Sequence, residues 1–245
     1  FLGELLAKTG VSRQIYTALS PLFSRLPGQL IQANIGTCTM FASVCGSSQA
    51  TAAVVGSIAY TELERQKYPP RWIAGSIAAG GTLGIMIPPS LALILYGWWE
   101  EVSVGRLFVA GIIPGIITAS LFMLYIGTIA KLRPSEFPKR EVVPWGIAIK
   151  ASLKVWPFIF LVFAILGTLI LGLATPTESA ALGAATAMIL AAMNRQLSIK
   201  VLWDSLVDTV LVMSTIGLII IGATVLSQAL ALSGLPSQIA QIVAH

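Results

Sequence analysis

Long stretches without charged residues dominate the chain, and they predict helices that cross a membrane. A spanning helix needs about 20 mostly apolar residues. The uncharged stretches are 26–61, 72–99, 107–130, 155–177, 179–194 and 209–244. From them we predict membrane spans over 72–97, 107–130, 155–174, 177–193 and 207–230. The predicted fold class is therefore an all-α integral membrane protein.

The composition agrees with a membrane protein and argues against a free cytosolic enzyme. The 245 residues are 56% hydrophobic and 10% charged, with a mean hydropathy of +0.86, whereas soluble domains average about 25% charged residues. The net charge of +5 does not indicate nucleic acid as a partner, because Lys and Arg in a membrane protein report orientation. Cys38 and Cys45 lack metal-ligand spacing and are expected to be packing residues.

The basic residues predict which side of the membrane each loop faces. Six of the fifteen Lys and Arg fall within 131–154, so this loop is expected in the cytoplasm. Alternating the spans from there places 98–101 and the C-terminus outside. It also places the basic residues of 65–71 and 195–200 in the cytoplasm, in agreement with the same rule.

Residues 12–25 predict an amphipathic helix that lies in the cytoplasmic interface. Ile15, Leu19 and Leu22 share one helical face, and Arg13 and Arg25 stand near the two ends. An apolar face flanked by basic residues is typical of helices that lie on a membrane.

The stretch 26–61 is too long for one span. A straight helix of its 36 residues would measure about 54 Å against a hydrocarbon core of about 30 Å. Both flanks are expected in the cytoplasm, so we predict a re-entrant hairpin that turns at Gly46, Ser47 and Ser48. Gly permits a positive φ at the turn, and Ser47 or Ser48 caps the outgoing helix.

The hairpin is rich in small polar residues, among them Asn34, Thr37, Ser43 and Gln49. Irregular backbone at membrane depth occurs only where it is buried in protein or lines a wet cavity, which makes the tip a candidate site. The alternative is a tight loop whose hydroxyls bond neighbouring helices. The hairpin alone favours neither interpretation.

The next predicted span contains a break. Its centre reads from Gly80 to Ser90 with three glycines followed by Pro88 and Pro89, and prolines end or unwind a helix. An unwound segment that meets the hairpin tip near the midplane is typical of secondary transporters. Since no acidic residue lies near either break in the sequence, neutral oxygens would favour a cation such as Na⁺ over a proton relay.

A short internal similarity indicates an inverted repeat. Residues 6–15 and 230–239 share five of ten positions and are expected on opposite sides of the membrane, as inverted-topology repeats require. The chain is expected to be a piece of a longer protein, with a second hairpin beyond His245.

Two charged features have ordinary structural interpretations. Thr175, Pro176 and Glu178 fit a capping box that starts the next helix, although a substrate or proton role for Glu178 is the alternative. Lys200 and Asp204 are expected to pair on a helix surface.

Several stretches resemble the large membrane subunit of tripartite ATP-independent periplasmic (TRAP) transporters, the DctM type. They are Phe41 to Ala53, Gly75 to Ser90, Val104 to Gly115 and Ala174 to Ala181. The resemblance implies an elevator-type secondary transporter in the bacterial inner membrane, driven by Na⁺ and without another cofactor. It also implies three partners: a small DctQ-type membrane subunit, a DctP-type periplasmic binding protein, and an organic anion such as a C4-dicarboxylate.

The resemblance also implies site residues and a division of the chain. The sodium site would use Gly46, Ser47, Ser48, Thr82, Gly84 and Pro88, and the substrate site would use Ser48, Gln49, Thr51 and Ser90. Residues 1–28 would form the end of a helix and the interfacial helix, and 29–97 half of a transport domain with its hairpin at 29–64 and its broken helix at 72–97. Residues 98–154 would form a scaffold-type helix and the basic loop, and 155–245 the start of the second repeat.

Three other functions are weighed against this one. An intramembrane serine hydrolase needs a base close to its nucleophile, yet the only histidine is His245. A channel with re-entrant loops and a stand-alone sodium/carboxylate symporter both stay open, and Na⁺-dependent saturable uptake separates a transporter from a channel.

Overall fold

The computed structural model describes residues 1–138 and 142–234, and within these residues the chain forms helices and turns but no strand. The helices are α1 (Leu2–Lys8), α2 (Val11–Phe23), α3 (Leu30–Cys45), α4 (Ser48–Arg65), α5 (Pro70–Met86), α6 (Leu91–Trp99), α7 (Val104–Leu132), η1 (Pro134–Glu136), α8 (Trp145–Ser152), η2 (Leu153–Val155), α9 (Trp156–Val162), η3 (Phe163–Gly167), α10 (Thr168–Ile170), α11 (Pro176–Met193) and α12 (Ile199–Leu232).

Four helical segments of the described chain are long and apolar enough to cross a membrane. They are 70–99, 104–132, 145–170 and 199–232. They contain three of the five predicted spans and overlap most of a fourth, 155–174, while α11, which covers the predicted span 177–193, is not among them. The prediction of an all-α, multi-pass membrane protein is confirmed, whereas the inverted repeat and the elevator motion stay predictions. Half of the second copy of the repeat, residues 235–239, lies outside the described residues.

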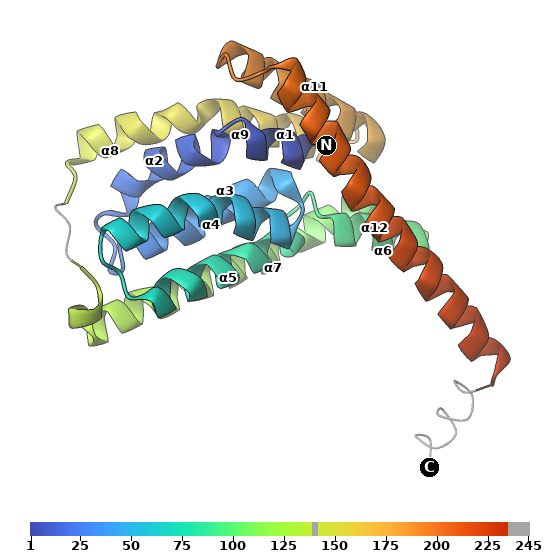
Figure 1. Cartoon of the computed structure of the whole chain (residues 1–245), viewed down its shortest axis with the longest axis horizontal. Helices are drawn as coiled ribbons and strands as arrows, with labels where there is room; N and C mark the ends of the chain where they lie inside the picture. The colour runs from blue at the N-terminus through green and yellow to red at the C-terminus, as the bar shows by residue number, and fades with distance from the viewer. Residues whose placement is uncertain (139–141, 235–245) are drawn as a thin grey trace.

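The helices stack in three layers with the hairpin α3–α4 in the middle (Figure 1). Helices α1, α2, α8 and α9 cover one side of the hairpin, and α5 and α7 cover the other. Helix α3 is buried over most of its length, because apolar clusters lie on both of its sides. Phe41 packs with Leu5 and Leu161 in one cluster, and Ile35 packs with Leu83 in the other.

The predicted turn of the hairpin is confirmed. Gly46 adopts the left-handed conformation, with φ of 68°, and ends α3. The Ser47 hydroxyl accepts a hydrogen bond from the Ala50 amide at 3.3 Å, so Ser47 is the residue that caps α4. The helix–turn–helix geometry is therefore as predicted, while its entry into a membrane stays a prediction.

The break in the next span is confirmed at its proline end, but the predicted unwinding from Gly80 onward is wrong. Helix α5 continues to Met86, and only Ile87 to Ser90 lie outside α5 and α6. A Cβ on Gly80 would lie 2.6 Å from the Cys38 sulfur, and one on Gly81 would lie 2.7 Å from the Ala52 Cβ. The glycines thus serve close helix contact instead of unwinding, since a residue without a side chain lets two helices approach.

Helix α7 packs along the hairpin and α5. The Gln32 amide donates to the Met123 carbonyl at 2.8 Å, and Ile126 fills the space that a Cβ on Gly28 would occupy. At one end of the helix the Glu136 carboxylate accepts from the Trp72 indole at 2.8 Å and pairs with Arg71 at 2.6 Å. This extensive packing joins α7 to the hairpin. The assignment of residues 98–154 to a scaffold stays a prediction.

The amphipathic character of residues 12–25 is confirmed, and the membrane position of α2 stays a prediction. Ile15 and Leu19 are buried against the hairpin side, while Arg13 and Thr17 are exposed.

The segment predicted as 155–174 begins earlier than expected, because α8 starts at Trp145 directly after Pro144. A Pro before a helix is favourable because its missing amide needs no partner there.

Helix α11 begins with the predicted capping box. Glu178 donates its backbone amide to the Thr175 hydroxyl, and its carboxylate accepts from the Thr175 amide at 2.7 Å.

The predicted ion pair between Lys200 and Asp204 is wrong, since no ion pair joins them in the described chain. Asp208, one helical turn further along α12, instead pairs with Lys8 of α1.

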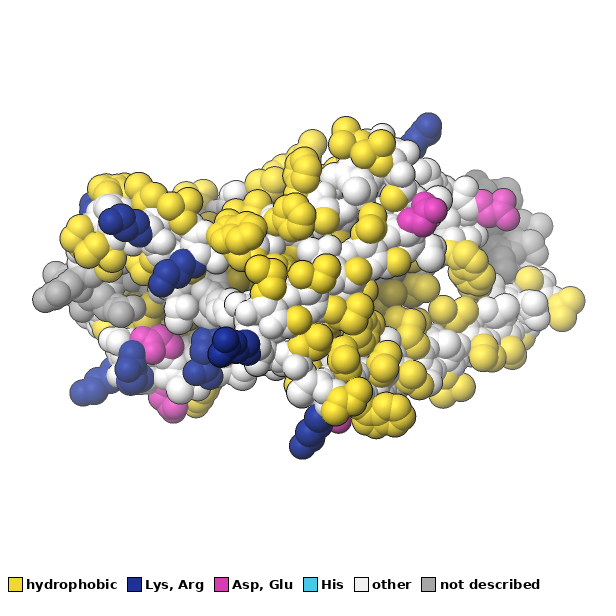
Figure 2. Space-filling model, turned by 90° about the horizontal axis from the view of Figure 1, so that it is seen from above, with side chains coloured by type: hydrophobic (Ala, Val, Ile, Leu, Met, Phe, Trp, Pro, Cys, Tyr) yellow, Lys and Arg dark blue, Asp and Glu magenta, His cyan; other side chains and the backbone are white. Residues whose placement is uncertain are grey.

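The surface has a basic end and a long exposed apolar helix. Lys and Arg gather at one end of the molecule, where α4 turns into α5 and α7 ends, while hydrophobic side chains cover much of the remaining face (Figure 2). Helix α12 projects beyond the other helices, and no part of its most apolar window is buried (Figure 1). This long apolar surface needs lipid or further protein against it.

Candidate functional site

The hairpin tip touches the break between α5 and α6. The Leu91 amide donates to the Gly46 carbonyl at 3.3 Å. A Cβ on Gly46 would lie 2.7 Å from the Pro89 carbonyl oxygen. Gly46 therefore serves both the positive φ and the close approach of two irregular backbone segments. The predicted meeting of tip and break is observed.

In a second contact, the start of α4 packs closely against α5. A Cβ on Gly84 would lie 2.5 Å from the Ser47 carbonyl oxygen and 2.9 Å from the Thr51 hydroxyl. These two neutral oxygens therefore converge on the same face of α5. The Ser47 carbonyl already accepts the Thr51 amide at 3.0 Å, and a carbonyl keeps a second lone pair.

The Thr51 hydroxyl is the unusual group of this contact. Thr51 has no exposed surface, and its oxygen makes no hydrogen bond to any nitrogen or oxygen of the described chain. Its interaction is with the Cys45 thiol, which is a weak hydrogen-bonding group. A buried polar atom left in this way costs stability unless a ligand or water satisfies it.

A cleft of about 490 Å³ opens beside the tip. Four parts of the chain contribute to its wall: the hairpin with Gly46, Ser47 and Gln49, the break with Pro89 and Leu91, the start of the chain with Glu4, and α12 with Thr209 and Met213. The cleft thus combines residues more than 160 positions apart in the sequence.

Glu4 corrects the expectation that the site is free of acidic groups. No acid lies near either break in the sequence, but the tertiary structure brings this carboxylate into the wall of the tip cleft. The sequence offers no pattern that links Glu4 to a tip forty residues away. Thr209 was missed for the same reason.

The structure brings together some of the residues predicted for the site and separates others. Gly46, Ser47 and Gln49 line the cleft, and Gly84 contacts Ser47. Ser48 and Thr51 lie on the α5 side of α4, where the Ser48 carbonyl approaches Gly81.

The three remaining residues lie elsewhere. Thr82 is exposed and its hydroxyl donates to the Ala79 carbonyl, so its side chain is not part of this arrangement. Pro88 packs near Gly111 of α7. Ser90 is fully buried and donates to the Ile85 carbonyl at 2.6 Å, which stabilises the break itself.

Comparison with known families shows what kind of protein carries this arrangement. Residues 1–245 match the family described as "Tripartite ATP-independent periplasmic transporter, DctM component". The chain belongs to the DctM family. Members of this family are components of transporters and not enzymes, so the hydrolase alternative no longer applies.

Individual members of the DctM family are similar over much of this chain. The C4-dicarboxylate TRAP transporter large permease protein DctM of Pseudomonas aeruginosa is 36% identical over 183 residues, which is 74% of this chain and 42% of that protein. The isethionate TRAP transporter permease protein DctMQ of Oleidesulfovibrio alaskensis is 31% identical over 242 residues, 98% of this chain and 38% of that protein. The sialic acid TRAP transporter permease protein SiaT of Haemophilus influenzae is 28% identical over 98% of this chain and 39% of that protein.

The coverage values also show what share of each relative's length this chain matches. The chain spans about two fifths of the length of these relatives.

Proposed function

We propose that the protein containing this chain imports an organic anion across the bacterial inner membrane, driven by a Na⁺ gradient. The relatives are named for C4-dicarboxylate, isethionate and sialic acid, all of which are organic acids. The proposal includes a DctQ-type small membrane subunit and a DctP-type periplasmic binding protein that delivers the anion. Family membership supports it, because the family name describes a tripartite periplasmic transporter.

One observation carries the sodium part of the proposal. The buried Thr51 hydroxyl and the Ser47 carbonyl converge on Gly84 beside the tip, and the hydroxyl has no nitrogen or oxygen partner in the described chain. Na⁺ is a hard cation that prefers several oxygen ligands, and broken helices near the midplane of transporters supply such oxygens from backbone carbonyls. We assign Gly46, Ser47 and Thr51 to the ion site, with Gly84 providing the space.

The anion belongs in the adjacent cleft. The first amides of α4 lack partners within the helix, and the positive end of a helix favours a carboxylate. Gln49 lines the cleft and adds an amide donor. Glu4 would repel a bound anion, so we expect a cation between them whenever the anion is bound.

The packing supports the proposed motion. Helices α3, α4 and α5 contact one another along their lengths, so the tip and the break move as one body in an elevator-type cycle. Alternating access then changes the side to which the tip cleft opens, as rigid-body movement around a fixed site requires.

Thr51→Val in the complete transporter tests the sodium proposal. Valine keeps the shape and removes the hydroxyl, so the fold without Na⁺ is expected to be as stable as before or slightly more stable. The Na⁺ concentration for half-maximal uptake is expected to rise about tenfold, as the loss of about 1.4 kcal/mol from one ligand implies.

Thr51→Ser is the matched control, because it keeps the hydroxyl. Ser47→Ala tests the capping side chain separately, and it weakens Na⁺ dependence through the position of the tip. An unchanged Na⁺ dependence in Thr51→Val would remove Thr51 from the ion site. Uptake that is insensitive to a Na⁺ gradient in the wild type would refute the sodium drive itself.

A further inference from the structure

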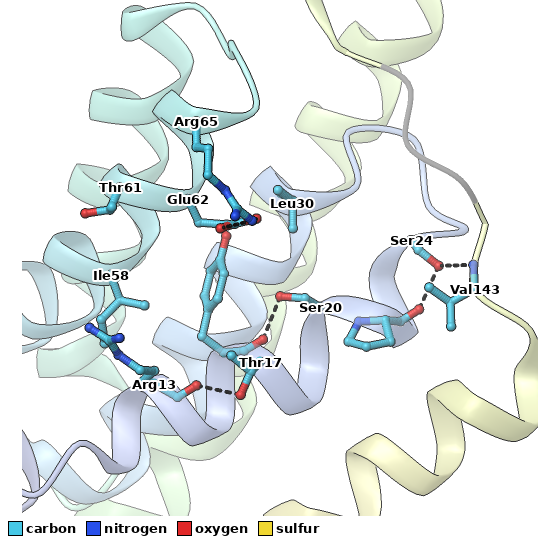
Figure 3. Close-up of a pocket in the computed structure, with 12 residues that line it drawn as sticks. Arg13, Thr17, Ser20, Ser24, Leu30, Ile58, Thr61, Glu62, Arg65 and Val143 are labelled. Atoms are coloured by element: carbon cyan, nitrogen blue, oxygen red, sulfur yellow. Dashed lines mark hydrogen bonds and ion pairs between the residues drawn. The ribbon is translucent and has the colours of Figure 1, made fainter.

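A second cleft lies further along the hairpin, between α2 and α4 (Figure 3). It has a volume of about 400 Å³. Arg13, Thr17 and Ser20 of α2 form one wall together with Ser24, which follows the helix, and Ile58, Thr61, Glu62 and Arg65 of α4 form the other. Leu30 and Val143 also line the cleft. The proposed transport cycle assigns no role to these residues.

Two arginines and one glutamate line the α2–α4 cleft, so its charges do not cancel. The Arg65 guanidinium pairs with the Glu62 carboxylate at 2.8 Å on α4. Arg13 makes no ion pair and no side-chain hydrogen bond within the described chain, and Figure 3 shows its guanidinium next to Ile58 on the facing helix. One cation is thus left over, and it presents free donors to the cleft. A guanidinium with free donors matches the geometry of phosphate and carboxylate oxygens.

The Thr17 and Ser20 hydroxyl groups of the cleft can accept hydrogen bonds but have no proton left to donate. The Thr17 hydroxyl donates to the Arg13 carbonyl at 2.9 Å, and the Ser20 hydroxyl donates to the Tyr16 carbonyl at 2.6 Å. A hydroxyl has one proton to donate and two lone pairs that accept. Since the protons are used within α2, these oxygens offer only acceptors. A ligand that fills the cleft therefore needs an anionic group at Arg13 and hydrogen-bond donors beside it.

The position of the cleft suggests where such a ligand comes from. One end of the cleft is lined by Arg65, the last residue of α4, and Lys and Arg gather where α4 turns into α5 (Figure 2). Basic residues concentrate at the cytoplasmic headgroup level of membrane proteins. Ile58, half-buried in the wall of the cleft, offers an apolar neighbour for an acyl chain. A free dicarboxylate would satisfy Arg13 but would bring no donor for the hydroxyl oxygens.

We propose that the α2–α4 cleft binds the headgroup of a membrane phospholipid. The phosphate lies at the Arg13 guanidinium, and the terminal amine or hydroxyl of the headgroup donates to the Thr17 and Ser20 oxygens. A bound lipid would join α2 to the outgoing helix of the hairpin.

The test uses the complete, detergent-purified and delipidated protein. Its thermal unfolding is measured while phosphatidylethanolamine or phosphatidylcholine is added in mixed micelles. Phosphatidylethanolamine is expected to raise the unfolding temperature, and phosphatidylcholine, whose terminal group has no N–H, is expected to raise it much less. Arg13→Gln is expected to weaken the apparent affinity for phosphatidylethanolamine about tenfold, as the loss of one charge-assisted hydrogen bond implies.

Matched variants make the result specific. Arg106→Gln removes an exposed arginine of α7 outside the cleft and is expected to leave the lipid response unchanged. Thr17→Val keeps the charge, removes an acceptor and is expected to reduce the preference for phosphatidylethanolamine over phosphatidylcholine. It also serves as the test if Arg13→Gln does not fold.

Four results would overturn the proposal. They are equal responses to the two lipids, an Arg13→Gln variant that responds like the wild type, equal losses in Arg13→Gln and Arg106→Gln, and an equal, Arg13-dependent response to glycerophosphoethanolamine or succinate. The last result would assign the cleft to a soluble anion instead of a lipid.

Discussion

Gly84→Ala is the sharpest perturbation of the candidate ion site, because it acts on the contact between α5 and the hairpin tip without removing any polar group. The new Cβ would lie 2.5 Å from the Ser47 carbonyl oxygen and 2.8 Å from its carbon. Both atoms belong to the backbone, so no side chain can rotate away. Restoring an ordinary contact of 3.4 Å requires the tip and α5 to separate by about 0.9 Å.

The magnitude follows from the cost of overfilling a packed interface. Inserting a methyl group into such a contact costs about 1–3 kcal/mol, while replacing Gly by Ala inside a helix gains up to about 1 kcal/mol. Gly75→Ala in the same helix isolates the second effect, because nothing lies within 4 Å of its Cβ position. The difference between the two variants is therefore the steric cost alone, about 1–3 kcal/mol.

Na⁺-dependent uptake by the complete transporter in proteoliposomes is the assay. If the strain acts on the ion-bound tip, the Na⁺ concentration for half-maximal uptake rises by roughly 5- to 150-fold in Gly84→Ala. Gly75→Ala is expected to match the wild type. Equal Na⁺ dependence in the two alanine variants would refute the reasoning that this contact positions the ion ligands.

Two further predictions concern the ends of helices. The Trp72 indole hydrogen bond, followed by Arg71, holds the pKa of Glu136 below its ordinary value of 4.5. The tie between α5 and η1 is therefore fully present above pH 4.5 and is lost as the pH falls through the lower pKa of the folded protein. Hydrogen exchange of 133–138 is expected to accelerate only at that lower pH, and Glu136→Gln should exchange fast at every pH; a variant with the wild-type pH profile would contradict this. Thr175→Ala is expected to cost about 0.5–2 kcal/mol in the first turn of α11, measured by hydrogen exchange against Thr186→Ala, and equal exchange in both variants would show that the cap contributes nothing.

Local features of the sequence predicted the hairpin well. The turn at Gly46 and the cap at Ser47 depend on residues within a few positions of one another. The same holds for the capping box of α11, where Thr175 and Glu178 are three residues apart. Such features need only the backbone and the nearest side chains, so they can be predicted without a tertiary structure.

The glycine-rich part of α5 shows where local reasoning fails. Gly80, Gly81 and Gly84 stand in the stretch that the sequence predicts to be unwound, because Pro88 and Pro89 follow them. In the structure they remain helical, since their missing side chains allow α5 to lie against Cys38, Ala52 and Ser47. Helix contacts on both sides outweigh the intrinsic cost, and the sequence does not tell which neighbour will use a glycine.

The sequence by itself determined that the chain lies in a membrane, that residues 26–61 turn back on themselves, and that prolines interrupt the following helix. These properties follow from hydrophobicity and from the backbone chemistry of Gly and Pro, which act over short distances. Only the tertiary structure decided that the Thr51 hydroxyl is buried with no nitrogen or oxygen partner among the described residues, that Glu4 and Thr209 join the tip cleft, and that Asp208 pairs with Lys8. These properties depend on side chains far apart in the sequence, and packing of whole helices is what brings them together.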